Sequence, residues 1–201
     1  MNQQHAWSPH ATTILGVRRG NDVALAGDGQ VTMGDIVLKH KARKLRTLHD
    51  GEVIAGFAGA VADALTLFGA FETHLQATDG NLRRAAVALA KEWRSDRYLR
   101  RLEAQLIVSD GESLLVISGE GDVIEPDDGI VAIGSGAPFA TAAAKALVSN
   151  TEMTAEEVVR EAMRITEEIC IYTNKEISVE VAHAGDDGDA AERADDGKEE
   201  I

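Results

Sequence analysis

The sequence predicts an α+β fold in which two mostly antiparallel sheets lie between layers of helices. Three observations support this prediction. The elements follow the order strands, two helices, strands, two helices, strand. Neighbouring strands are separated by short turns, which is typical of antiparallel hairpins. The chain has 201 residues, 44% of them hydrophobic, which is enough for one domain with its own core. Helices packed outside two sheets would bury both faces of each sheet.

The first half of the chain is expected to form a hairpin, further strands and two helices. An apolar, alternating segment begins at Thr12, turns at 20–22 and returns through 23–26. Residues 31–38 are expected as another strand pair or an extended loop, and 52–58 as a buried strand. Apolar residues at helical spacing predict two helices, with inward faces at Val61, Leu65, Phe68 and Leu75, and at Leu82, Ala86, Leu89 and Trp93.

The second half is expected to contain strands, two helices and a final strand. The strands are predicted at 104–109, 113–118, 130–133 and 177–181. Pro138 suits the first turn of an Ala-rich helix that ends near Asn150. Thr154 and Glu157 have the spacing of a capping box at the start of the other helix.

Charge and composition narrow the possible partners and location. The net charge of −14 argues against nucleic acid as a partner, and no segment is long and apolar enough to span a membrane. Residues 184–201 hold eight Asp or Glu against two Lys or Arg, so a disordered acidic tail is expected. The single cysteine, Cys170, cannot form an internal disulfide. Without an export signal, a cytoplasmic location is expected.

The first eleven residues look like a leader. They contain no Lys, Arg, Asp or Glu and no apolar run, so they resemble neither a secretory signal nor a membrane anchor. The chain is therefore interpreted as a leader at 1–11, a folded domain at 12–183 and a tail at 184–201.

Common catalytic and cofactor motifs do not occur in this sequence. Ile133 stands where a G-x-S-x-G motif around Ser135 would need glycine. The sequence contains no H-E-x-x-H, no cysteine pair for zinc, no phosphate-binding glycine loop and no histidine beside a convincing nucleophile.

One mechanism needs no histidine. Cleavage between Ala11 and Thr12 would give Thr12 a free α-amine, whose pKa of about 8 lets it accept the proton of its own hydroxyl. A nearby lysine would keep that amine neutral, a carboxylate would orient the lysine, and backbone N–H groups would bind the oxyanion. The chain contains all these groups, but spacing alone does not bring them together.

Several segments, in order, resemble the HslV (ClpQ) family of bacterial peptidases related to proteasome β subunits. They are TTILGVRRG, ALAGDGQVTMG, KARKLR, VIAGFAGAVADALTLF, AVALAKEWRSDRYLRRLEA, AIGSGAPFA and ICIYTN, and the resemblance covers about residues 12–180. It implies a four-layer αββα N-terminal nucleophile (Ntn) hydrolase fold and a double hexameric ring. It also implies an HslU-type hexameric AAA+ ATPase as partner, which consumes ATP and delivers unfolded protein substrates.

The resemblance also assigns a catalytic set. Thr12 is the nucleophile, Lys44 in KARK is its electrostatic partner, and Asp28 in AGDGQ orients the lysine. Gly56 in AGFAG supplies an oxyanion N–H, and Ser135 in GSGAP stands near the amine of the nucleophile. Because the leader is longer than a single Met, the resemblance implies self-cleavage, in which the Thr12 hydroxyl attacks the Ala11 carbonyl.

A sodium ion bound by backbone carbonyls is a further implication of the resemblance. The ligands map to Glu167, Cys170 and Thr173, at and before ICIYTN. Family members often have Gly-Asp just before this segment, whereas this chain has Glu167 and Glu168. A carbonyl ligand at 167 survives that change because every residue has a carbonyl, but no role is assigned to the carboxylate of Glu168.

Each candidate residue also has a purely structural interpretation. Thr13 competes with Thr12, although strand alternation sends it to the opposite face. Asp28 could be a turn residue, Lys44 a solvated lysine and Ser135 a helix cap. Cys170, Glu167 and Glu168 could simply belong to the core and to a solvated helix face. The basic stretch 39–46, with five Lys or Arg, could face acidic groups of a neighbouring subunit.

Three functions remain open from the sequence. The favoured one is the threonine-type endopeptidase subunit of an ATP-dependent protease. A small-amide Ntn amidohydrolase and a non-catalytic ring subunit that keeps its leader are the alternatives.

Overall fold

A computed structural model describes residues 12–33, 35–102 and 104–184 of this chain. The leader predicted at 1–11 lies outside these residues, and so does the predicted acidic tail beyond Ala184. Both domain boundaries therefore stay predictions.

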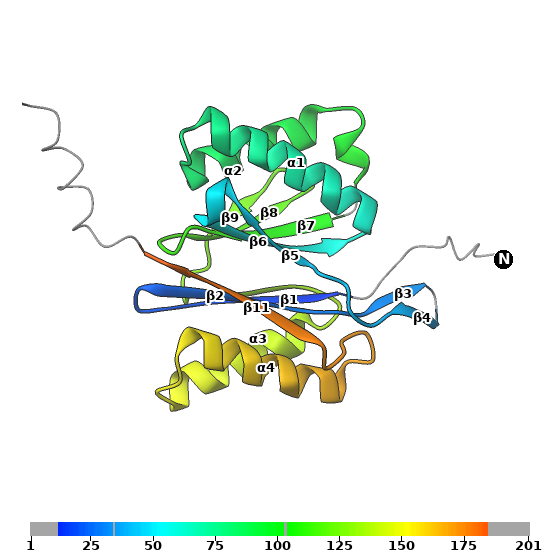
Figure 1. The fold of residues 1–201 in the computed structure, drawn as a ribbon, viewed down its shortest axis with the longest axis vertical. Coiled ribbons are helices and arrows are strands. Elements are labelled where there is room, and N and C mark those ends of the chain that lie inside the picture. The colour runs from blue at the N-terminus through cyan, green and yellow to red at the C-terminus, as the bar shows by residue number, and fades with distance from the viewer. Residues whose placement is uncertain (1–11, 34, 103, 185–201) are drawn as a thin grey trace, which may run out of the picture.

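Four layers make up the described part of the chain, in the order helices, sheet, sheet, helices (Figure 1). The pair α1 (Val61–Ala77) and α2 (Leu82–Ser95) covers one sheet, and the pair α3 (Ala137–Asn150) and α4 (Ala155–Ile169) covers the other. The arrangement agrees with the predicted α+β fold, in which helices bury the outer faces of two sheets.

The first sheet brings four strand ends together at one edge of the molecule. Its strands have the order β10-β1-β2-β11, all neighbours antiparallel: β1 (Thr13–Arg19), β2 (Asp22–Asp28), β10 (Ile130–Gly134) and β11 (Ile177–His183). Thr13 lies opposite Gly134, and Asp28 lies opposite Ile177. The start of β1 therefore lies at the same end of the sheet as the end of β2.

The second sheet is also antiparallel and has the order β5-β6-β7-β8-β9. Its strands are β5 (Leu45–Leu48), β6 (Val53–Gly59), β7 (Ala104–Ser109), β8 (Leu114–Ser118) and β9 (Val123–Ile124). A separate hairpin contains β3 (Val31–Met33) and β4 (Ile36–Lys39), and short 3-10 helices lie at His49–Gly51 and Leu99–Arg101. Sequence analysis missed β5, because only Leu45 and Leu48 break its polar run, and the two-residue β9.

Apolar side chains fill the three spaces between the four layers. The helix pairs each cover a buried cluster, and a third cluster lies between the sheets and includes Ile14, Leu25 and Ile107. The predicted inward face of α2 is confirmed, since all four of its residues are buried. The prediction for α1 is wrong at Leu65, which is 58% exposed. It lies about 100° around the helix from the buried Ala64 and so beside the inward stripe.

The helix start predicted at Thr154 is confirmed. The Thr154 hydroxyl accepts a hydrogen bond from the Glu157 N–H, and the Glu157 carboxylate accepts one from the Thr154 N–H, at 3.3 and 2.8 Å. This reciprocal pair satisfies two amides that have no partner within the helix. Among the described residues, no helix is long and apolar enough to cross a membrane.

Candidate active site

Thr12 immediately precedes β1 and is only 5% exposed. Its carbonyl accepts a hydrogen bond of 2.8 Å from the Ser135 N–H, which ties it to the end of β10. Gly134 makes this approach possible, because its φ is +89° and a Cβ there would lie 2.1 Å from the Thr12 carbonyl oxygen. Thr12 also lines a cavity of about 710 Å³, so the residue is held by its backbone at the wall of a cavity.

Lys44 and Asp28 form a buried ion pair beside the start of β1. The Lys44 Nζ donates to Asp28 Oδ1 at 2.8 Å, and the two side chains are 2% and 0% exposed. Lys44 directly precedes β5 and Asp28 ends β2, so the pair joins the two sheets. Burial is the main cause that lowers the pKa of Lys44, and the charge and hydrogen bond of Asp28 oppose it. The solvated-lysine interpretation of Lys44 is wrong.

The Asp28 carboxylate holds two backbone segments as well as the lysine. Its Oδ1 also accepts from the Thr13 N–H at 2.8 Å, and its Oδ2 accepts from the Gln30 N–H at 2.8 Å. The turn interpretation of Asp28 is therefore correct but incomplete. Hydrogen bonds to an ionised carboxylate are stronger than neutral ones, so these contacts fix the start of β1 relative to the lysine.

Thr13 faces away from the cavity, as strand alternation predicts. Its hydroxyl shares a hydrogen bond of 2.6 Å with the Thr173 hydroxyl and accepts one of 3.1 Å from the Gly136 N–H. Thr13 is fully buried in this arrangement. Of the two threonines, Thr12 is the one that lines the cavity.

Ser135 contacts Thr12 and Gly56 packs against Ile14, but the chemical roles of both residues stay predictions. Ser135 does not cap α3, because Gly136 occupies the N-cap position. Gly56 lies in β6 opposite Leu45, and the next residue, Phe57, donates its N–H to the Lys44 carbonyl at 3.3 Å. A Cβ on Gly56 would lie 2.7 Å from Ile14 Cγ2, so glycine permits the sheets to pack closely here.

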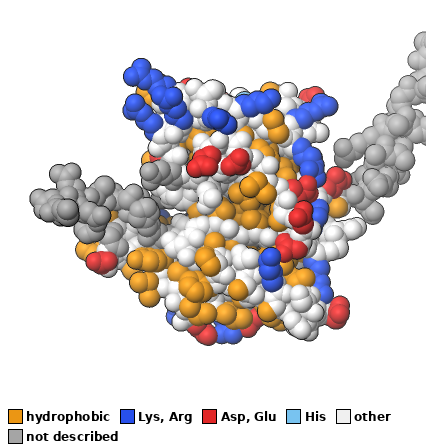
Figure 2. Space-filling view, turned by 180° about the vertical axis from the view of Figure 1, so that it is seen from behind, with side chains coloured by type: hydrophobic (Ala, Val, Ile, Leu, Met, Phe, Trp, Pro, Cys, Tyr) orange, Lys and Arg blue, Asp and Glu red, His pale blue; other side chains and the backbone are white. Residues whose placement is uncertain are grey.

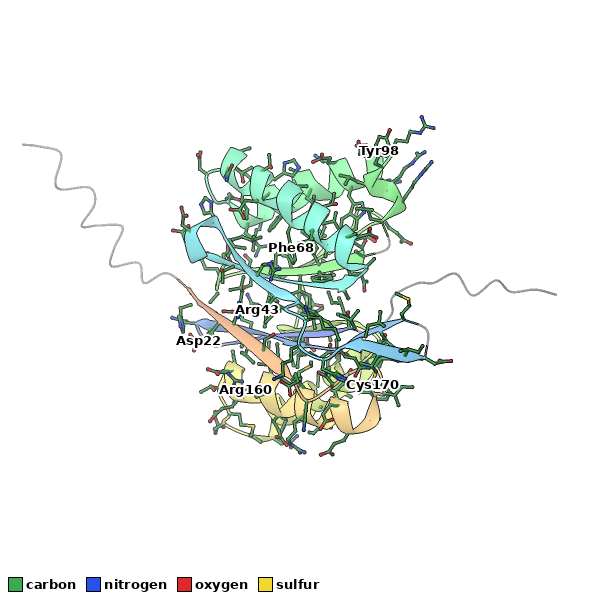
Figure 3. All side chains as sticks on the ribbon, turned by 45° about the vertical axis from the view of Figure 1, so that its right-hand side comes forward. Asp22, Arg43, Phe68, Tyr98, Arg160 and Cys170 are labelled. Atoms are coloured by element: carbon green, nitrogen blue, oxygen red, sulfur yellow. The ribbon has the colours of Figure 1, made fainter. Side chains whose placement is uncertain are left out.

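The cavity beside Thr12 has an apolar wall and a cationic rim. The wall is formed by Phe57, Ala64, Leu65 and Phe68, and the rim by Lys39, Lys41, Arg43 and Arg46. Figure 3 shows Phe68 in the α1/α2 half of the molecule and Arg43 below it. Sequence reasoning missed this wall. The sequence carried no signal for it, because helical spacing placed Leu65 on the inward face of α1.

The segment predicted to hold sodium lies at the end of α4. Glu167 is in the last turn, and Cys170 is the C-cap, whose carbonyl accepts from the Thr173 N–H at 3.0 Å. Carbonyls at a helix C-terminus lack partners within the helix and carry partial negative charge, which suits a small cation. The described residues contain no group of three His, Cys, Asp or Glu placed to hold a metal. The helix C-terminus supplies carbonyl oxygens of the kind that the predicted sodium ion needs, and the ion itself stays a prediction.

Glu168 does not belong to this donor set. Its carboxylate pairs with the Arg164 guanidinium on the exposed side of α4. The solvated-face interpretation therefore holds for its side chain. Cys170 is buried, as the core interpretation predicted.

Comparisons with known proteins now identify the fold and the enzyme class. Residues 8–182 match the family described as Proteasome subunit. The "ATP-dependent protease subunit HslV" of Desulfovibrio desulfuricans is 58% identical over 172 residues, covering 85% of this chain and 97% of the relative. The crystal structure of eukaryotic HslV from Trypanosoma brucei superposes with a TM-score of 0.81 at 52% identity, covering 85% of this chain and 99% of the other.

These matches confirm three predictions: the resemblance, the four-layer Ntn-hydrolase fold, and a threonine-type peptidase that serves as the proteolytic subunit of an HslUV-type protease. The family match at 8–182 includes Thr12, Asp28 and Lys44. The chain therefore belongs to the proteasome-subunit family, within its HslV branch.

Proposed function

We propose that Thr12 is the nucleophile of this peptidase, exposed as the N-terminal residue when residues 1–11 are removed by self-cleavage. The observation that carries the proposal is the buried Lys44–Asp28 pair, which joins the sheets at the strand end where Thr12 lines a cavity. A lysine ammonium kept out of water is costly, and such groups gather at catalytic sites. The substrates are unfolded protein chains, which can enter a cavity as extended segments.

The chemistry needs one residue as both nucleophile and base. The Thr12 hydroxyl attacks the substrate carbonyl while the Thr12 α-amine takes the hydroxyl proton. The ammonium so formed then donates this proton to the leaving nitrogen of the substrate. The positive charge of Lys44 favours the neutral form of the α-amine, and Asp28 keeps the lysine charged and oriented. The Gly56 N–H is proposed to bind the oxyanion, with Ser135 near the amine. Water then hydrolyses the acyl-enzyme ester and frees Thr12.

A sodium ion held by the carbonyls of Glu167, Cys170 and Thr173 is proposed as a structural cofactor. It would supply positive charge at the C-terminal end of α4. The chain itself orders the 170–173 turn through the hydrogen bond from the Thr173 N–H to the Cys170 carbonyl. The Thr173 hydroxyl meets the Thr13 hydroxyl, so the order of this turn supports the start of β1.

Assembly into a double hexameric ring, capped by an HslU-type AAA+ ATPase hexamer in the cytoplasm, is the proposed setting. The ATP is consumed by the partner, as the name "ATP-dependent protease subunit" of the relative suggests. Large apolar side chains exposed on β4 and just after α4 support contact with other subunits: Ile36, Val37, Leu38 and Ile171. Figure 2, which views the molecule from behind, shows apolar side chains gathered on its lower half, away from a corner rich in Lys and Arg.

Substitution Thr12→Ala, combined with intact mass, tests the proposal. We expect the wild-type protein to lose residues 1–11 and to hydrolyse a fluorogenic peptide. The variant should keep its leader and lose at least about 10³-fold in kcat, because nucleophile and base disappear together. Assembly, followed by size-exclusion chromatography with light scattering, should persist.

Other outcomes would favour the alternatives. Peptide hydrolysis by Thr12→Ala at the wild-type rate would contradict the nucleophile assignment. A wild-type protein that keeps its leader and cleaves nothing would indicate a non-catalytic ring subunit. Hydrolysis of small amides, with no degradation of unfolded casein when the ATPase and ATP are present, would indicate an amidohydrolase.

A further inference from the structure

We propose that Asn174 is a positioning residue that clamps the two backbone segments carrying Asp28 and Lys44 against each other. The proposal rests on the proposed function, because its catalytic effect acts through that ion pair. Asn174 follows α4, in the connection to β11, and no part of the catalytic assignment uses it.

Asn174 bonds three backbone groups with the two ends of one side-chain amide. Its Oδ1 accepts from the Gly29 N–H at 3.2 Å and from the Glu176 N–H at 3.2 Å. Its Nδ2 donates to the His40 carbonyl at 3.0 Å. Gly29 follows Asp28 directly, and His40 lies four residues before Lys44. One side chain thus joins the turn after β2 to the loop that leads to Lys44.

The two clamped segments also contact each other directly. The Ala42 N–H donates to the Gly29 carbonyl at 2.9 Å. A Cβ on Gly29 would lie 2.3 Å from the His40 carbonyl oxygen, so the backbones approach more closely than any other residue type would allow. The Asn174 side chain bonds both segments beside this close contact. It therefore fixes the distance between the 40–43 loop and the turn after Asp28.

A second residue anchors the same turn to the same connection. The Gln30 Nε2 donates to the Ile171 carbonyl at 3.0 Å, while the Gln30 N–H donates to Asp28 Oδ2. The 171–174 segment therefore contacts the turn after Asp28 at two neighbouring residues, Gly29 and Gln30. Asn174 differs from Gln30 because it alone of these two also reaches the loop of Lys44.

Loss of the Asn174 hydrogen bonds should lower the rate of the chemical step. Gly29 and His40 do not line the cavity, whereas Lys41 and Arg43 of the same loop do, so KM should change less than kcat. The Lys44 ammonium, however, lies at the end of the loosened loop. A displacement of about 1 Å in a catalytic group can cost up to about 100-fold in rate.

The test compares three variants of the full-length protein. Asn174→Ala removes all three bonds. Asn174→Asp keeps the Oδ1 acceptor for Gly29 but places a carboxylate oxygen against the His40 carbonyl. Asn150→Ala is the matched control, because Asn150 Nδ2 also donates to a backbone carbonyl, that of Ala146, at the far end of α3. Fluorogenic peptide hydrolysis gives kcat and KM, and hydrogen–deuterium exchange follows peptides covering 27–31 and 39–46.

We expect both Asn174 variants to lower kcat by about tenfold or more, with a smaller change in KM. Exchange should accelerate in 39–46 for both variants and also in 27–31 for Asn174→Ala. Asn150→Ala should match the wild type in every measurement. A general loss of structure would instead accelerate exchange throughout the chain.

Three results would overturn the proposal. They are wild-type kcat in Asn174→Asp, unchanged exchange in both segments, or a loss of kcat that added sodium chloride restores, which would assign the effect to the neighbouring cation site. A wild-type protein that hydrolyses no peptide would refute the proposed function instead. The exchange experiment would still decide whether Asn174 clamps the two segments.

Discussion

The buried ion pair of Lys44 and the exposed ion pairs of Arg164 have similar distances between charged atoms but differ in burial. Lys44 meets Asp28 at 2.8 Å between the two sheets, and Arg164 meets Glu161 at 2.8 Å and also pairs with Glu168 along α4. The Lys44 and Asp28 side chains are 2% and 0% exposed, whereas that of Arg164 is 53% exposed. Burial, not distance, separates the two groups.

The difference in burial separates an ion pair that supports catalysis from ion pairs that belong to the solvated surface. A buried pair loses most of its hydration, so its attraction contributes little net stability, but removal of one partner is severe because the other charge stays buried. An exposed helical pair is screened by water and salt, so each partner is dispensable. We therefore expect activity to depend on the first group and not on the second.

Substitution Lys44→Met should have the largest effect. It removes the charge beside the nucleophile, so kcat should fall by about 10²- to 10³-fold. It also leaves the Asp28 carboxylate buried without its cation, which should lower the free energy of unfolding by about 3–5 kcal/mol. Peptide hydrolysis and urea unfolding at fixed protein concentration measure the two effects.

The double variant Asp28→Asn, Lys44→Met separates stability from activity. It removes both charges, so much of the lost stability should return while kcat stays low. A double variant as unstable as the single one would contradict the view that an uncompensated charge causes the loss. Wild-type kcat in Lys44→Met would remove the lysine from the mechanism.

High pH should inactivate the enzyme without unfolding it. Burial lowers the pKa of Lys44 below its usual value of 10.5, so the ammonium loses its proton in the folded state first. As pH rises through this lowered pKa, kcat should fall. Between it and 10.5 the unfolded chain binds more protons at this residue, so the contribution of Lys44 to stability rises with pH.

The measurement is a kcat profile against pH together with circular dichroism at each pH. The loss of kcat should be reversible and should precede any change in the spectrum. Activity that persists until the protein unfolds, or up to pH values above 10.5, would contradict the lowered pKa. Lys44→Met, which has no proton to lose at this position, should lack this alkaline limb.

The same contrast explains how far sequence reasoning reached. The capping box at Thr154 and the inward face of α2 could be predicted because they depend on spacing within one segment. The pairing of Lys44 with Asp28 depends on two strands in different sheets. No local pattern distinguishes Lys44 from its four basic neighbours in 39–46, so only the family resemblance pointed to it.

Contacts that depend on packing between layers could not be predicted. Leu65 has helical spacing to Phe68, yet it is largely exposed, because the stripe toward the sheet is centred on Ala64, Phe68 and Phe71. Ser135 has the sequence context of a helix cap, yet α3 begins one residue too late for it. Asn174 lies in the ICIYTN motif, but two of the three backbone groups that it bonds belong to Gly29 and His40, which are 145 and 134 residues away in the sequence.

Substitution Arg164→Ala should have the smallest effect, although it breaks more ion pairs than Lys44→Met. Glu161 and Glu168 would remain in water, so no buried charge results, and Tm should change by no more than about 3 °C. Differential scanning calorimetry at low and high salt should show the difference shrinking as salt rises, with kcat unchanged. A loss of kcat instead would connect the Glu168 carboxylate, freed of its arginine, to the carbonyl cluster at Glu167 and Cys170. The surface interpretation of this helix face would then be wrong.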